Sequence, residues 1–468
     1  MISFPLKIVE PTTIRLRRVF VVGVALSALA VAIYRAPKWL EDWNPAVVAV
    51  AIAAAALAVL ALWIAIRGSA RAVKRVALEI FFLGGALLGA EAVLLASSPE
   101  RWSDNPVAQR LTERERVARA SGLPFDARLR SDVVRDLQAR GLDAVPGLAQ
   151  GMALDPKLAG AIAERGLLPL SNASNAYVVE CNEGLGYFHF RSDEHGFNNP
   201  PGLLSGPVDV AVVGESLALG HCVPPSQGAV DLIRKQYPRT ANFGVAGSRV
   251  LSHLATFREY VEPLRPPTIL WFVNVNYAQP REEADHPVLQ RYLTDPSFSQ
   301  GLAHRQDEVD SVVRDIVIPA ILKGDDAARN ELAKPAPLHR LIKLREVRNL
   351  VDFGSALQPS EPAEDLSHFD RAIRLAARTA GTWGGRLIVV VLPNYSLSVG
   401  EPATVARYEA VMQVLNASTL EVVDGAALFA AQPDARSLYT LRIENHPSEQ
   451  GHALLANAIL AAIRQEAK

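Results

Sequence analysis

Three long apolar runs dominate the first hundred residues of the chain. They cover residues 19–34, 46–66 and 76–96. A helix needs about 20 residues to cross the hydrocarbon core of a bilayer, so the second and third runs are long enough to span it. The first run is shorter, but Tyr34, Trp39 and Trp43 suit the membrane–water boundary and can extend it. The pattern predicts three transmembrane helices.

Basic residues flank these runs unevenly. Those before the first run are Lys7, Arg15, Arg17 and Arg18, and those between the second and third are Arg67, Arg71, Lys74 and Arg75. Between the first and second runs, two basic residues are offset by two acids. Because cytoplasmic loops carry the excess of Lys and Arg, we expect the N-terminus inside and everything after Ser97 outside. This predicts a multi-pass protein of the cytoplasmic (inner) membrane with a periplasmic or extracellular soluble domain.

Two features of these runs have alternative interpretations. The Arg-rich start also fits a cleaved signal peptide, although no small-x-small cleavage site precedes Arg35. Glu79 and Glu91 lie in the third run, where a carboxylate in lipid is costly. Both are within about two turns of an end of the run, so we expect them to reach toward the interface.

The polar remainder of the chain divides into a short helical region and a longer α/β region. Residues 98–175 show helical spacing interrupted by Pro and Gly, which predicts a helical linker or stalk. After it, apolar runs alternate with helical stretches. The runs are 208–213, 269–273, 387–392 and 420–423, with a shorter one before Asn242. Continuous apolar strands alternating with helices predict a parallel sheet covered on both faces, within a domain over 176–468.

Composition narrows the function classes. The chain has 48 basic and 49 acidic residues, which argues against a nucleic-acid partner. No His/Asp set has metal-ligand spacing, so neither a metal nor a cofactor is expected. The two cysteines, Cys181 and Cys222, lack CxxC spacing. They either form one disulfide in an exported domain or are two separate buried thiols.

Polar motifs follow the predicted strands, at the sheet edge where parallel α/β folds place ligands. The first is Gly214-Glu215-Ser216 through Gly220, the second Asn242-Phe243-Gly244 through Gly247, and the third Asn274-Val275-Asn276. The last is His446-Pro447, followed by Gly451 and His452. A serine between strand and helix gains exposure at the sheet edge and a helix N-terminus that favours developing negative charge.

In their order and spacing these motifs resemble the SGNH hydrolase (GDSL esterase/lipase-like) superfamily over about residues 187–463. His195-Gly196-Phe197 resembles the lead-in of its membrane-anchored members. The resemblance implies a flavodoxin-like three-layer α/β/α domain. It also implies Ser216 as nucleophile and His446 as general base and acid. The oxyanion hole would combine the N–H groups of Ser216 and Gly247 with the amide of Asn276, with Asn274 as its rival.

The chain departs from the family pattern at three places. The acid beside the serine is Glu215, and Tyr277 stands where the family has an aspartate. The aspartate expected two or three residues before the histidine is missing, and Glu444 is the only acid within reach. Glu444 is therefore the expected third member of a Ser–His–acid triad. The insertion at about 280–367, with an amphipathic run at 338–352, is expected to form a helical cap that decides substrate choice.

These features together predict a membrane-anchored serine esterase that forms an acyl-enzyme on Ser216. The substrate would be an acyl-ester small molecule, a lipid or a glycan. One alternative is an O-acetyl or other acyltransferase that modifies an exported cell-envelope polysaccharide. Three spans are too few for an acyl-donor channel, so a membrane partner is then expected. The other alternative is a catalytically inactive glycan-binding or assembly protein with the same fold.

Overall fold

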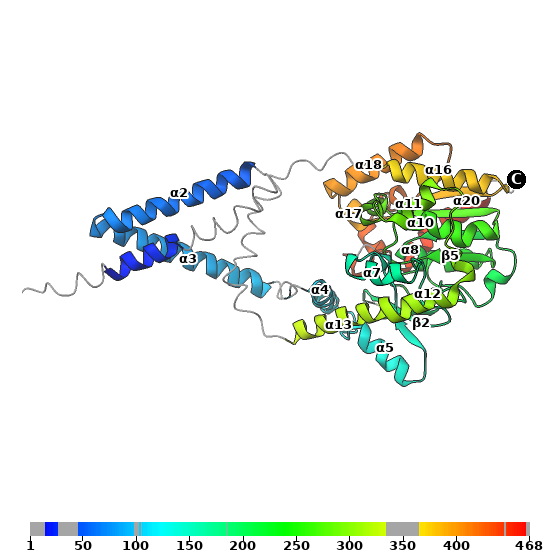
Figure 1. The fold of residues 1–468 in the computed structure, drawn as a ribbon, viewed down its shortest axis with the longest axis horizontal. Helices are drawn as coiled ribbons and strands as arrows, with labels where there is room; N and C mark the ends of the chain where they lie inside the picture. The colour runs from blue at the N-terminus through cyan, green and yellow to red at the C-terminus, as the bar shows by residue number, and fades with distance from the viewer. Residues whose placement is uncertain are drawn as a thin grey trace, which may run out of the picture. The chain divides into compact units, whose positions relative to one another are not determined.

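The computed structural model describes residues 15–26, 45–97, 103, 105–184, 186–333, 365–443 and 446–464. They belong to two units, shown with their elements in Figure 1, and each is described separately. In the first unit, residues 15–26 are helical, and the helices α2 (Pro45–Arg67) and α3 (Ala70–Ser97) follow.

The expectation of three transmembrane helices is corrected to one candidate helix among the described residues. Only the stretch Ala70–Leu95 of α3 is long and apolar enough to cross a membrane, and the apolar stretch Ala56–Arg67 of α2 is shorter. The first predicted run is described only as far as residue 26. The run at 46–66 is long enough by its sequence to cross a bilayer, but the apolar stretch described within it, Ala56–Arg67, is too short.

Most of the basic residues between the second and third runs lie within a helix. Helix α3 begins at Ala70, so Arg71, Lys74 and Arg75 lie within it rather than in a loop. Lys and Arg are good helix formers, and Arg75 also pairs with Glu79 one turn later at 3.0 Å. Only Gly68 and Ser69 separate the two helices.

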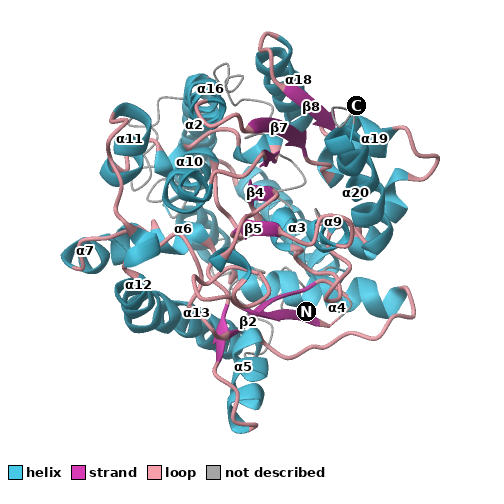
Figure 2. Ribbon diagram, turned by 90° about the vertical axis from the view of Figure 1, so that its right-hand side faces the viewer, coloured by secondary structure: helices cyan, strands magenta, loops and turns pink. Residues whose placement is uncertain are grey.

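A five-stranded parallel sheet forms the centre of the second unit (Figure 2). Its strands are β4 (Val210–Gly214), β5 (Thr240–Gly244), β6 (Thr268–Val273), β7 (Arg386–Val391) and β8 (Glu421–Asp424). They lie in the order β5-β4-β6-β7-β8, with every neighbouring pair parallel. This is the doubly wound order of flavodoxin-like folds, so the predicted α/β fold with a parallel sheet is confirmed. The short strand expected before Asn242 is β5, which includes that residue.

Alternate residues of the central strands enter two separate cores. Val210 and Val212 pack on one face of the sheet, and Ala211 and Val213 pack on the other. The first face is covered by α9 (Ala229–Arg234), α19 (Gly425–Ala430) and α20 (Glu449–Arg464). The second is covered by α10 (Val250–Thr256), α16 (Ser367–Gly381) and α18 (Pro402–Asn416). Burial on both faces explains why the strands read as continuous apolar runs.

A small second sheet was not foreseen from the sequence. β1 (Ala144–Pro146) pairs in parallel with β2 (Tyr177–Asn182), which pairs antiparallel with β3 (Tyr187–Arg191). The helices near it are α4 (Pro106–Ala120), α5 (Arg130–Ala139), α6 (Gln150–Ala153) and α7 (Pro156–Glu164). The expected boundary at residue 175 falls inside this sheet, and residues 103–175 belong to the same unit as the central sheet.

The described part of the insertion is helical. It contains α11 (Pro287–Thr294), α12 (Gln306–Val312), a π-helical stretch at Val313–Val317 and α13 (Ile318–Leu332). Helix α11 packs on α10 and α16, and α13 packs on α4 and α5. The amphipathic run at 338–352 lies outside the described residues.

Two glycines allow the carboxyl edge of the sheet to pack closely. Gly214 and Gly244 end β4 and β5 and lie opposite one another. A Cβ on Gly244 would come within 2.6 Å of the Leu219 nitrogen, and one on Gly214 within 2.7 Å of Phe272 Cβ. Only glycine fits at these positions, so the helix that follows β4 can lie directly against the strand ends.

Candidate active site

Ser216 stands where β4 ends and the one-turn helix α8 (Ser216–Leu219) begins. Glu215 caps this helix, and its carboxylate accepts the N–H groups of Ser216 at 2.7 Å and Leu217 at 3.3 Å. Gly220 ends it with a φ of 83°, a left-handed conformation that glycine adopts readily. The hydroxyl is thereby held at the carboxyl edge of the sheet, as the sequence predicts.

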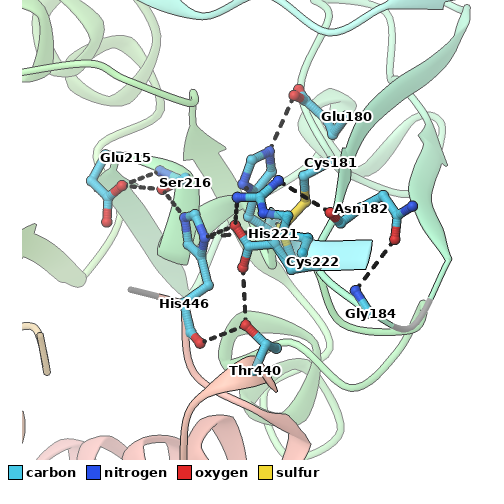
Figure 3. Close-up of a disulfide and its surroundings, with 12 residues drawn as sticks. Glu180, Cys181, Asn182, Gly184, Glu215, Ser216, His221, Cys222, Thr440 and His446 are labelled. Atoms are coloured by element: carbon cyan, nitrogen blue, oxygen red, sulfur yellow. Dashed lines mark hydrogen bonds and ion pairs between the residues drawn. A yellow bond between two sulfur atoms is a disulfide. The ribbon is translucent and has the colours of Figure 1, made fainter. Parts of the chain in front are cut away.

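His446 reaches Ser216 from the far end of the chain (Figure 3). Its Nε2 lies 2.8 Å from Ser216 Oγ. The backbone of His446 is fixed by Thr440, whose N–H donates to the His446 carbonyl at 3.1 Å. An isolated β-bridge between Tyr439 and Pro447 closes the same turn. The predicted nucleophile and base are therefore brought into hydrogen-bond contact.

A carboxylate that sequence reasoning missed completes the arrangement. Glu183, just after β2, lies 2.9 Å from His446 Nδ1. Its oxygens also accept hydrogen bonds from Arg114 Nη2 at 2.9 Å and Thr440 Oγ1 at 3.0 Å. The side chain of Glu183 is only 2% exposed. A buried carboxylate with three such partners is rigidly placed to orient an imidazole.

The charges around Glu183 favour its ionised form, which can orient the His446 imidazole. Burial alone would raise the pKa of Glu183, but His446, Arg114 and His221 together hold its pKa well below the usual range. A Glu183 that stays ionised accepts a hydrogen bond from Nδ1–H, which leaves the Nε2 lone pair facing the serine. This is the tautomer that a general base for Ser216 requires.

Glu444, the acid expected from the sequence, lies outside the described residues. Glu183 was missed because it is 263 positions from His446 in the chain and follows a strand of the small second sheet. The sequence held one signal for it. Pairing Cys181 with Cys222 would have brought Glu183 close to the segment that follows Ser216.

The expected oxyanion donors are partly engaged. The Ser216 N–H donates to Glu215, and the Ser216 hydroxyl also contacts that carboxylate. Gly247 follows β5 with a φ of 71°, a conformation that favours glycine. A substrate oxyanion would need the Ser216 N–H to turn from Glu215 toward it.

Both candidate amides after β6 are held by hydrogen bonds. Asn274 Oδ1 accepts the Asn276 N–H at 3.1 Å and so caps a short 3-10 turn. The carbonyl of Asn276 accepts from Arg249 at 3.2 Å, and its Oδ1 accepts from Arg407 at 3.3 Å. Arg249 therefore holds the backbone of Asn276 and Arg407 holds its side-chain oxygen, so the NH2 group is the part of the amide that can donate.

A disulfide joins Cys181 and Cys222 beside His446 (Figure 3). The sequence left this pairing open. Next to it, His221 Nε2 lies 3.2 Å from Glu180 Oε2, and the His221 ring packs edge-on against the His446 ring at 4.9 Å. The residues before the two cysteines thus form a second histidine–carboxylate pair alongside the first.

Two groups of side chains in the described part of the chain bring metal-type donor atoms within 4.8 Å of one another. One is Cys181, His221 and Cys222, and the other is Glu183, Cys222 and His446. Each includes a disulfide sulfur. Metal ligation by cysteine uses the thiolate, which a disulfide does not offer.

Two buried histidines give the fold a pH-dependent stability. Burial lowers the pKa of His452 and of His253 to about 3, with His446 contributing at His452. Their pKa is about 6.5 in an unfolded chain. Between these values the unfolded state binds protons that the folded state excludes, so stability falls as pH drops below about 6.5. Each histidine contributes at most about 1.4 kcal/mol per pH unit.

We therefore expect the melting temperature to fall between pH 7 and pH 5, and to fall less steeply in His452→Gln. Glutamine can still accept the Ala229 N–H that His452 Nδ1 accepts at 3.0 Å, but it does not titrate. Scanning calorimetry of the full-length protein in detergent checks this. Equal slopes for variant and wild type would contradict the assignment of His452 as a neutral buried group.

No protein-family model and no curated protein matches the chain. Several solved structures are similar to it over about half its length. A lipase/acylhydrolase from Enterococcus faecalis shares 14% identity at a TM-score of 0.32, covering 55% of this chain and 95% of its own. A lipolytic G-D-S-L family protein from Veillonella parvula shares 14% at 0.31, covering 55% and 98%. An acetylxylan esterase from Geobacillus stearothermophilus shares 15% at 0.29, covering 54% and 93%.

Proposed function

We propose that the protein is a serine esterase that cleaves acyl esters through an acyl-enzyme on Ser216. The observation that carries this proposal is the continuous hydrogen-bonded chain from Ser216 Oγ through the His446 imidazole to Glu183. Nucleophile, base and orienting carboxylate come from three separate parts of the sequence. A chain of this kind is the geometry that activates a serine hydroxyl.

The proposed steps are those of a serine esterase with an acyl-enzyme. Ser216 Oγ attacks the ester carbonyl while His446 Nε2 takes its proton, and Glu183 stabilises the imidazolium that forms. The tetrahedral oxyanion is held by N–H donors of Ser216 and Gly247 and by the Asn276 amide. His446 then returns the proton to the leaving alcohol, and the acyl group stays on Ser216. Water activated by the same histidine releases the acid.

The capping carboxylate of Glu215 is a specific feature of this mechanism. In the structure it holds the Ser216 N–H and contacts the hydroxyl, so it competes with the oxyanion for the same donor. Substrate binding would have to displace it or share the N–H. This makes oxyanion formation a step at which a bound substrate can be selected.

The membrane location extends the proposal. Helix α3 contains a stretch long and apolar enough to cross a bilayer, and basic residues crowd the sequence before it. We infer an anchored enzyme of the cytoplasmic membrane with its N-terminus inside and its catalytic unit outside. A cell-envelope glycan or lipid ester is then the substrate within reach.

Covalent labelling tests the proposal directly. A fluorophosphonate reacts with an activated serine, and we expect one adduct on the full-length protein in detergent, mapped by peptide mass spectrometry to Ser216. Ser248 offers an internal comparison, because it also contacts a histidine, with Oγ 3.0 Å from His253 Nε2. Ser248 and His253 are buried, and no carboxylate contact is found at His253 Nδ1 among the described residues. Ser248 should stay unlabelled.

The other candidate functions are outcomes of the same experiment. No labelling and no hydrolysis of p-nitrophenyl acetate would favour a non-catalytic binding protein. Labelling with slow hydrolysis that accelerates when an acceptor sugar is added, with acylated sugar as product, would favour an acyltransferase. Labelling at a serine other than Ser216 would overturn the nucleophile assignment.

A further inference from the structure

Glu183 reaches the catalytic pair from outside the central sheet. Ser216 and His446 belong to segments that pack on that sheet, whereas Glu183 follows β2 of the small sheet. The carboxylate must nevertheless stay within hydrogen-bond distance of Nδ1 for the histidine to keep the required tautomer. The position of one small segment relative to another therefore decides whether the chain of hydrogen bonds is complete.

Strand pairing holds this segment only loosely. The register between β2 and β3 shifts between Val179 and Asn182, so the ladder is interrupted at Cys181. Beyond it, Asn182 pairs with Tyr187 of β3, and side-chain contacts add to this single pairing. Arg114 Nη1 donates to the Asn182 carbonyl at 3.1 Å, and Asn182 Nδ2 donates to the Asp126 carbonyl. These contacts tie Glu183 to α4 and the loop before α5, not to the nucleophile.

The covalent tie between the two segments is the disulfide. Cys181 lies two positions before Glu183, and Cys222 lies six positions after Ser216. The His221 N–H, next to Cys222, donates to the Ser216 carbonyl at 3.0 Å, and Cys222 Sγ is 3.9 Å from His446 Nδ1. The bridge therefore connects the chain beside the orienting carboxylate directly to the chain beside the nucleophile.

The side chains next to the two cysteines also link these two segments. His221 and Glu180 immediately precede the two cysteines and contact each other across the bridge. Glu180 is buried, and its carboxylate rests against Gly147, where an added Cβ would be 2.1 Å from Glu180 Cδ. The carboxylate of Glu180 fills the space that the missing side chain of Gly147 leaves, and movement of Cys181 would disturb both histidine–carboxylate contacts together.

We propose that the Cys181–Cys222 disulfide is a positioning element for Glu183, so that ester cleavage depends on the oxidised state of this bond. The inference rests on the proposed function. A dithiol such as dithiothreitol would break the bridge. It supplies two electrons and two protons, the S–S bond becomes two thiols, and the dithiol closes to its own cyclic disulfide. The chain has only two cysteines, so a reductant acts on this bond alone.

The test compares oxidised protein, reduced protein freed of dithiothreitol by gel filtration, and the double variant Cys181→Ser/Cys222→Ser. Removing the reductant matters because thiols themselves cleave p-nitrophenyl acetate. We expect kcat to fall at least tenfold in both altered forms while KM changes less than twofold. Reoxidation should restore kcat in the reduced protein. Circular dichroism and melting above the assay temperature establish that the fold is retained.

Repeating the comparison in the Glu183→Gln variant distinguishes loss of Glu183 positioning from a general loss of rigidity in the protein. In Glu183→Gln the carboxylate is already absent, so removing the disulfide should change the remaining kcat less than twofold. An equal fold loss in both backgrounds would overturn the proposal, as would an unchanged kcat after reduction verified by alkylation of both thiols. If Ser216→Ala had no effect on activity, the proposed function itself would fail instead.

Discussion

Replacing Ser216 by alanine is expected to lower kcat for p-nitrophenyl acetate by about 10⁴-fold or more, and replacing His446 by glutamine by a similar factor. Each substitution removes one half of the same proton transfer, because Ser216 Oγ and His446 Nε2 are in direct contact at 2.8 Å. Residues that act as a unit show strongly non-additive losses, so the double variant should be no slower than either single variant.

Steady-state kinetics on full-length protein in detergent checks this expectation. His189→Gln is a matched control, since His189 is an exposed histidine on β3 whose ring lies 3.1 Å from the nearby Tyr187 carbonyl. Its kcat should equal that of the wild type. Losses that multiply in the double variant would show that the two side chains act in separate steps, which contradicts the proposed pair.

Glu183→Gln is the second large effect, with an expected loss in kcat of about 10³–10⁴-fold and little change in KM. Glutamine keeps the shape of the side chain, but its amide NH2 can donate to His446 Nδ1. That would place the ring proton on Nε2, facing Ser216, where it cannot accept the hydroxyl proton. The loss arises from the wrong tautomer rather than from an altered fold.

The pH profile distinguishes orientation from mere structural support. A neighbouring carboxylate favours the protonated form of an imidazole, so without it the acid limb of kcat should move to lower pH. Glu444→Gln is the matched control, and its kcat should stay within a fewfold of the wild type. If Glu444→Gln carried the large loss and Glu183→Gln did not, the acid expected from the sequence would be the orienting group.

The arrangement also explains how the chain departs from the family pattern it resembles. The orienting acid is delivered from the small sheet, where Arg114 and Thr440 hold it. Such a carboxylate does not need to lie near the histidine in sequence. It needs only to be held rigidly within hydrogen-bond distance of Nδ1. Buried hydrogen bonds between three separate segments hold it there.

What the sequence determined by itself is local. The strands of the central sheet follow from continuous apolar runs, and their parallel order from the helices between them. Ser216 follows because parallel strands bring their carboxyl ends to one edge, whereas His446 follows from the resemblance of its His-Pro motif to the SGNH pattern. Each of these inferences needs only a pattern within one segment and a general rule for stacking the segments.

What only the tertiary structure decided depends on contacts between distant segments. Glu183, which follows β2, meets His446 from a distant part of the chain, and Cys181 pairs with Cys222 although nothing in their spacing requires it. The three residues of β1 are too few to show a strand pattern in the sequence, and they form a strand only because they pair with β2. No single segment encodes these contacts, because burial and hydrogen bonding select them only when the whole unit has packed.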